Sequence, residues 1–122
     1  MIKLTLPLPP SVNSYQPHTS RGGRCVRYLS AKAKLFKYEV TRIVMKENAA
    51  LMVESRLKLS IVIHPRDKRK IDLDNRIKPI QDALQDAGVF KDDCQIDKLV
   101  VKRGNIVKNG KAIIEIELVG DK

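Results

Sequence analysis

The sequence predicts a single domain over residues 1–122 of the α/β (α+β) class, with a mixed β-sheet of about four strands and two main helices. Its 122 residues suit one hydrophobic core. Apolar residues alternate in several short segments, as in half-buried strands, and recur at helical spacing in two longer ones. A hydrophobic share of 43% without any low-complexity tract indicates a folded protein, although 31% of the residues are charged.

The first half of the chain predicts a strand, a loop and a helix. Residues 2–8 alternate as a strand does, and three prolines end it before a polar loop over residues 11–24. Ser30 is a candidate N-cap for a helix that runs to about residue 48. Lysines and arginines on its outer faces either solvate the helix or contact DNA. The apolar residues that would form its buried stripe are Ala33, Phe36, Val40, Ile43 and Val44.

A second strand and a second helix follow. Residues 56–63 alternate, with leucines and isoleucines on one side, which predicts a half-buried strand. Residues 75–87 carry apolar side chains at helical period, and Gly88 is expected to end that helix. Pro79 restricts where the helix can begin, because proline is tolerated only near the first turn.

The C-terminal part predicts a β-hairpin. Two further strands are expected over residues 96–107 and 112–119. Between them lie Asn109 and Gly110, and Asn-Gly between two such runs is a strong local signal for a tight hairpin turn. The sequence therefore predicts that these two strands pair with each other.

The charge of the chain favours nucleic acid as its partner. Lys and Arg total 24 against 14 Asp and Glu, a net charge of +10, and cationic side chains that neutralise phosphates release counterions. No stretch approaches the ~18 consecutive apolar residues of a membrane span, and the N-terminus lacks the apolar segment of a signal peptide. We expect a cytoplasmic protein with no membrane partner.

Neither the cysteines nor the histidines predict a metal site. Cys25 and Cys94 lie far apart without CxxC spacing, so they are expected to be buried or idle thiols in a reducing compartment. His18 and His64 are isolated, and the expected place for each is a solvated loop.

Negative charge is concentrated in one part of this basic chain. Of the 14 acidic residues, seven lie between positions 72 and 97, directly after a basic run over residues 64–70: Asp72, Asp74, Asp82, Asp86, Asp92, Asp93 and Asp97. If the segment of Asp72 and Asp74 is extended, both carboxylates project from one face, with Cα atoms about 6.6 Å apart. Two or three such carboxylates suffice for a magnesium ion beside a phosphate backbone. The alternative is that Asp74 or Asn75 caps the following helix.

Further charged residues complete the candidate site. Lys78 lies one helical turn beyond Asp74 and could reach into the site, or it could pair with Asp82 at i,i+4. Asp92 and Asp93 follow the turn at Gly88, which could fold back so that one of them meets the first two aspartates; a solvated turn is the alternative. The candidate DNA-binding residues are Arg66, Lys68, Arg69, Lys70 and Arg76.

The order and spacing of these residues resemble a known family, the RusA Holliday junction resolvases, which are crossover junction endodeoxyribonucleases common in phages and prophages. The resemblance includes a leucine- and proline-rich opening over residues 6–13 and spans most of the chain. The motif residues in register are Lys68, Arg69, Lys70, Asp72, Asp74, Asn75, Lys78, Asp82, Ala83, Leu84, Gly88, Asp92 and Asp93. One departure is Ile71, where the best-known member continues its arginine run.

The resemblance implies roles for particular residues. It makes Asp72, Asp74 and Asp93 metal-binding and Lys78 catalytic, with Asp92 the less certain member of its pair. It also implies an α/β fold, a homodimer, four-way junction DNA as partner and a divalent cofactor, usually Mg2+, with Mn2+ as a substitute.

The resulting hypothesis is a structure-specific endodeoxyribonuclease that resolves four-way (Holliday) DNA junctions by paired magnesium-dependent hydrolysis, in DNA recombination and repair. Two alternatives stay open. A non-catalytic basic nucleic-acid-binding module would bind DNA regardless of chelators and cut nothing. A magnesium nuclease acting on other branched DNA would nick without paired symmetric cuts in a four-way junction.

Overall fold

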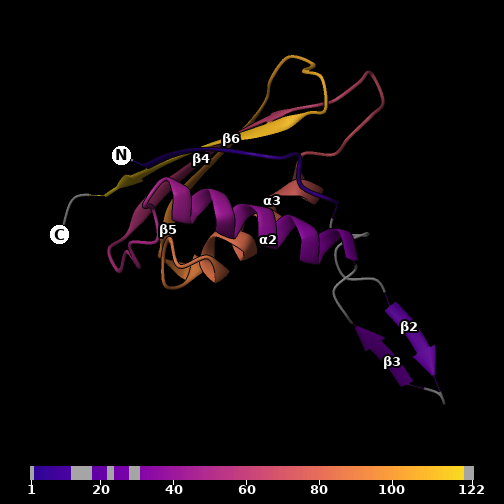
Figure 1. Ribbon diagram of the computed structural model, residues 1–122, viewed down its shortest axis with the longest axis horizontal. Coiled ribbons are helices and arrows are strands. Elements are labelled where there is room, and N and C mark those ends of the chain that lie inside the picture. Colours follow the sequence, from indigo (N-terminus) through magenta and orange to yellow (C-terminus); the bar gives the residue numbers. More distant parts are fainter. Residues whose placement is uncertain (1, 12–17, 22–23, 28–30, 120–122) are drawn as a thin grey trace.

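A four-stranded mixed β-sheet forms the centre of the computed structural model, which describes residues 2–11, 18–21, 24–27 and 31–119 (Figure 1). Its strands, in spatial order, are β1 (Ile2–Leu6), β6 (Lys111–Leu118), β4 (Leu57–His64) and β5 (Ile96–Arg103). The pairs β1–β6 and β6–β4 are antiparallel, whereas β4–β5 is parallel. The predicted α+β class with a mixed sheet of about four strands is confirmed.

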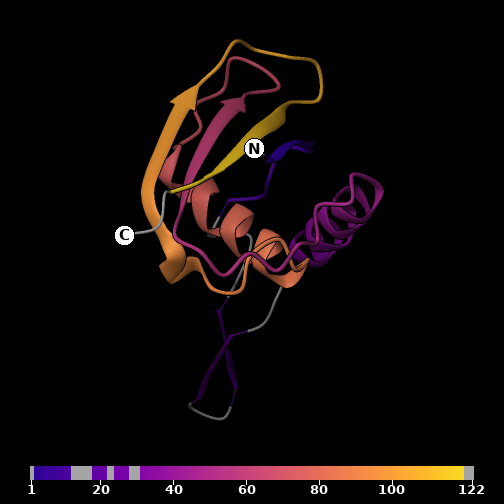
Figure 2. The ribbon, with the colours of Figure 1, turned by 90° about the vertical axis from the view of Figure 1, so that its left-hand side faces the viewer.

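Two helices, α2 (Ala31–Lys46) and α3 (Asp74–Asp86), cover one face of this sheet (Figure 2). Every second residue of β4 is buried, as the alternation predicts. These side chains share one core cluster with inward-facing residues of β1 and β6 and with the apolar stripes of both helices. In α2 the stripe is as expected except that Ile43 is only partly buried. None of the described helices is long and apolar enough to span a membrane.

The predicted hairpin between the last two strands is wrong. The turn itself forms: Asn109 and Gly110 both have φ of 68°, and the Gly110 amide donates to the Val107 carbonyl at 2.8 Å. However, β5 and β6 each pair with β4, which lies between them. The connection crosses the end of β4, where the Gly104 amide donates to the Ile63 carbonyl at 2.8 Å. The tight turn therefore forms as predicted, but β4 lies between the two strands that the turn connects.

A second correction concerns the loop predicted for residues 11–24. Part of it belongs to a separate two-stranded antiparallel sheet, β2 (His18–Arg21) and β3 (Arg24–Arg27). Both views show this ribbon standing clear of the main sheet (Figures 1 and 2). The candidate N-cap Ser30 lies outside the described residues.

Helix α3 begins and ends one residue earlier than predicted, at Asp74 and Asp86. Gly88, with φ of 85°, follows it in the left-handed conformation that favours glycine. Pro79 is the sixth residue of the helix, in its second turn, so its restriction to the first turn was wrong. Its ring is buried in the core side of the helix, and this packing offsets the missing N–H that would donate to the Asn75 carbonyl.

Candidate functional site

Asp72 and Asp74 lie at the start of α3, directly after the basic loop. The segment is not extended as expected: Leu73 has φ −61° and ψ −41°, which are helical values, and Asp74 is the first residue of the helix. The two side chains therefore do not share a face through strand alternation. Both residues are exposed nonetheless, so their carboxylates remain open to a ligand from solvent.

The capping alternative for this pair is not realised. The N-cap position is Leu73, and no side chain caps the helix. Asn75 instead donates its side-chain amide to Oδ2 of Asp72, at 3.3 Å. Asp74 sits in the first turn, where the helix dipole favours an anion. Within the described residues, neither carboxylate is paired with a lysine or an arginine.

Lys78 follows one turn later on the same helix. Its Nζ lies 3.3 Å from Oδ1 of Asp82, so the predicted i,i+4 pair does form in the free chain. The lysine side chain is 57% exposed. An exposed pair of this kind is weak, at about 0.3–0.5 kcal/mol, and leaves the ammonium group free to move to a stronger anion.

Asp92 has a structural role in the turn before β5. It is the N-cap of a short 3₁₀ helix, η1 (Asp93–Gln95): its carboxylate accepts the Cys94 amide at 3.1 Å, and Gln95 accepts the Asp92 amide at 2.7 Å. The Cys94 amide, and next the neighbouring Asp93 side chain, hold the pKa of Asp92 below its ordinary value. The buried Gln95 side chain also donates to the carbonyls of Val53 and Ser55, which fixes the turn. Asp93 is thereby left as the member of the pair without a capping role.

Asp93 lies at the other end of α3 from Asp74. Its amide donates to the side-chain carbonyl of Gln85 at 3.2 Å, and Gln85 belongs to the last turn of the helix. Gln85 is eleven residues beyond Asp74, which corresponds to about 16 Å along the helix axis. The single chain thus does not bring Asp93 to Asp72 and Asp74. Across the described ranges, no three His, Cys, Asp or Glu side chains group closely enough to hold a metal ion.

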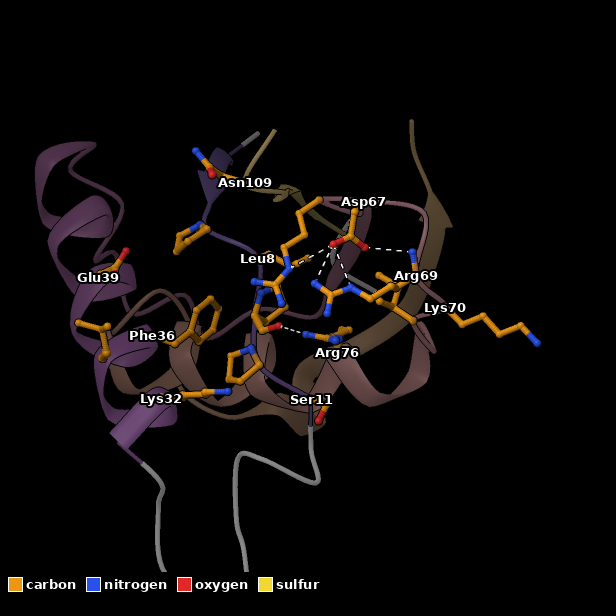
Figure 3. A pocket seen from close by; sticks show the side chains of 16 residues that line it. Leu8, Ser11, Lys32, Phe36, Glu39, Asp67, Arg69, Lys70, Arg76 and Asn109 are labelled. Atoms are coloured by element: carbon orange, nitrogen blue, oxygen red, sulfur yellow. Dashed lines mark hydrogen bonds and ion pairs between the residues drawn. The ribbon is translucent and has the colours of Figure 1, made fainter. Parts of the chain in front are cut away.

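The basic loop before α3 is organised around one carboxylate. Asp67 accepts the Arg69 amide at 3.0 Å and the Arg69 guanidinium at 2.8 and 3.0 Å, and Arg66 Nε lies 3.9 Å from the same carboxylate (Figure 3). Arg69, through its hydrogen bonds, holds the pKa of Asp67 below its ordinary value. Lys68 and Lys70 are exposed beside them. The loop therefore presents a cationic surface on the approach to Asp72.

Arg76, a candidate DNA contact, is used inside the protein. Its guanidinium donates to the Pro9 carbonyl and so ties α3 to the segment after β1. Burial, and next the nearby charge of Arg66, lower its pKa from the ordinary arginine value.

The structure also adds a residue that the sequence did not suggest. Arg103, at the end of β5, donates to the Ile71 carbonyl at 2.9 Å. Its guanidinium therefore lies beside position 71, where this chain has isoleucine instead of a basic residue. The two positions are 32 residues apart, so only the strand order reveals this contact.

The sequence of this chain is similar to known proteins over a range that includes all residues of the candidate site. The family model described as Endodeoxyribonuclease RusA matches residues 7–118. A crossover junction endodeoxyribonuclease of Enterobacteria phage HK97 is 34% identical over 114 residues, which is 93% of this chain and 92% of that protein. Its counterpart in Shigella sonnei is 34% identical over 119 residues, covering 98% and 96%. The one in Escherichia coli K12 is 33% identical over the same 98% and 96%.

Proposed function

Because this chain belongs to the endodeoxyribonuclease RusA family, we propose that it resolves four-way DNA junctions by paired, magnesium-dependent hydrolysis of phosphodiester bonds, in DNA recombination and repair. Relatives that match more than nine-tenths of the chain are named crossover junction endodeoxyribonucleases, which supports this substrate. The matched range includes the basic loop, α3 and the turn at Asp93.

One observation carries the metal part of the proposal: Asp72 and Asp74 are exposed and have no cationic partner within the described residues, in a chain of net charge +10. Lysines or arginines pair with several other acids of this chain, among them Asp67, Asp82 and Asp86. Asp72 and Asp74 are only two residues apart at the start of α3, so the negative charge of each raises the cost of the other and a bound cation would lower that cost. Their oxygens are the donors that magnesium prefers, and manganese accepts the same donor set.

The third carboxylate of the site is proposed to come from a second copy. In one chain Asp93 is at the far end of α3 from Asp74, about 16 Å along the axis. A two-fold symmetric homodimer can place Asp93 of the partner subunit against Asp72 and Asp74, and the reverse, which gives two identical sites. Two such sites suit a four-way junction, which is resolved by one nick in each of two strands.

Each residue has a distinct task in this proposal. When bound, magnesium would polarise the scissile phosphate and lower the pKa of a water molecule for in-line attack. Asp72, Asp74 and the partner's Asp93 would hold the ion. Lys78 would leave Asp82 and contact the phosphate as negative charge develops on it. The cationic loop would hold flanking phosphates and keep the strand in register without reading its sequence.

The substitution Asp72→Asn tests the metal role. We expect it to abolish nicking of a synthetic four-way junction in magnesium while junction binding persists, because a ligand charge is lost and the cationic loop is intact. Full nicking by the variant would overturn the role. Binding without any nicking by the unmodified protein would favour a non-catalytic module, and unpaired nicks would favour a nuclease for other branched DNA.

A further inference from the structure

A pocket of about 470 Å³ lies beside the candidate metal site and is separate from it (Figure 3). Its walls are the segment of residues 7–11, residues 32–39 of α2 and the loop of residues 66–71, with Arg76 and Asn109 completing the lining. Asp72, Asp74, Lys78 and Asp93 do not line it. Ile71 does line it, so the pocket borders Asp72, the first proposed metal ligand.

The lining of this pocket is strongly cationic. Five residues with cationic side chains and two with carboxylates, Asp67 and Glu39, line it, and the Lys70 side chain extends away from the hollow (Figure 3). The cations come from three parts of the chain: Lys32 from α2, Arg66, Arg69 and Lys70 from the loop, and Arg76 from α3. Cations from separate elements that converge on one hollow repel one another, and an anion in the hollow removes that repulsion.

Two details of the pocket indicate which anion fits. Arg69 donates from Nε and Nη2 to a single oxygen, Oδ2 of Asp67, and the two nitrogens form a fork that can take two oxygens of a phosphate group. Arg76 has an enclosed Nε–H without a hydrogen-bond partner in the described part of the chain, and burial together with the charge of Arg66 lowers its pKa. Asp67 thus binds only some of the guanidinium N–H groups that line the pocket, and the pocket keeps a net positive charge.

We propose that this pocket binds a phosphate group of the DNA backbone next to, and distinct from, the one that is cut, and that Asp67 holds the loop arginines until that phosphate displaces it. The displacement exchanges one anion for another: the Asp67 carboxylate releases Arg69 to solvent-accessible phosphate oxygens. Asp67 is then a positioning residue. It keeps the guanidinium groups arranged for phosphate, and it weakens binding to DNA that cannot fill the pocket. This inference rests on the proposed action on DNA.

The first test compares Asp67→Asn with Asp97→Asn. Asp97 also pairs with an exposed arginine, Arg56, but does not line the pocket, so the control removes the same charge elsewhere. Junction binding without divalent metal should become roughly five- to tenfold tighter at 0.1 M salt for Asp67→Asn, because the phosphate no longer has to displace a charged hydrogen-bond partner from Arg69. The control should change little. Equal tightening in both variants, or none in Asp67→Asn, would overturn the role of Asp67.

The second test needs no DNA and uses inorganic phosphate. In ¹⁵N spectra of arginine side chains, the Nε–H signals of Arg69 and Arg76 should shift on titration, at lower phosphate concentration in Asp67→Asn and at higher concentration in Lys32→Met. The Arg56 signal should stay in place. Unmoved Arg69 and Arg76 signals would overturn the phosphate pocket itself. A protein that shows these shifts and fails to bind junctions would instead refute the proposed function and leave the pocket standing.

Discussion

The Nζ atom of Lys78 lies 3.3 Å from Oδ1 of Asp82, one turn further along α3. This pair keeps an ammonium group on the helix that begins with Asp74, on the exposed side of the molecule. Because the pair is exposed and weak, a phosphate bound at the start of α3 can compete for the lysine. The free chain thus holds its proposed catalytic cation in a neighbouring, easily broken contact.

We predict that Lys78→Met strongly reduces nicking and leaves stability almost unchanged. The Lys78–Asp82 pair stabilises the helix by only a few tenths of a kcal/mol. The Lys78 ammonium group is expected to stabilise the transition state by several times that free energy. Single-turnover nicking rates and thermal melting of the same preparation measure the two effects. The matched variant Asp82→Asn breaks the same pair and should retain nicking. Equal loss of activity in both variants would mean that the pair, and not the free lysine, matters.

The neighbouring residues Asp92 and Asp93 should respond in opposite ways to substitution. Asp92→Ala removes the cap of η1 and should lower Tm by about 3 °C while magnesium-dependent nicking persists. Asp93→Asn should abolish nicking at nearly unchanged Tm, since only its amide makes a hydrogen bond to α3. Melting curves and junction cleavage on both variants decide the matter. The reverse pattern would exchange the two roles.

The cap formed by Asp92 also predicts a pH dependence of stability. Its pKa in the folded chain is lowered from 3.8, chiefly by the hydrogen bond from the Cys94 amide. The carboxylate therefore stabilises the fold above about pH 4, and that contribution is lost as the pH falls through the folded pKa. Between about pH 5 and 2, Tm should fall more steeply for the unmodified protein than for Asp92→Asn, which keeps an oxygen acceptor and takes up no proton. Parallel curves would exclude this role for the carboxylate.

Mixed dimers test whether the site is completed between two copies. After refolding together, Asp72→Asn and Asp93→Asn should regain about a quarter of the active sites, because half of the dimers are mixed and each mixed dimer has one intact site. Those dimers should nick one strand only. Mixing Asp72→Asn with Asp74→Asn should restore nothing, since both substitutions damage the same half of the site. No recovery in the first mixture would place the whole site within one chain.

Much of this architecture could be predicted from local sequence patterns. The alternation of β4 and the helical period of α2 and α3 depend on which side chains face the core, and the structure confirms them. Strand order could not be predicted, because the turn at Asn109 specifies a local bend and not the strand that lies beside it. Hence the sequence suggested a hairpin where β4 lies between β5 and β6.

The candidate site shows the same limit. The residue types and their spacing identified the acidic cluster, but the helical conformation of Leu73 and the cap made by Asp92 depend on contacts that spacing does not express. The distance between Asp74 and Asp93 follows from the length of α3 between them. Only the fold shows that one chain places them at opposite ends of a helix and that Arg103 reaches position 71.

The most direct test of the account is a cleavage map of a synthetic mobile four-way junction with and without magnesium. Paired nicks at symmetric positions in two opposite strands are expected when magnesium is present, and intact, bound junction when it is chelated. Undiminished cleavage in the presence of a chelator, or an uncut junction in magnesium or manganese, would contradict it.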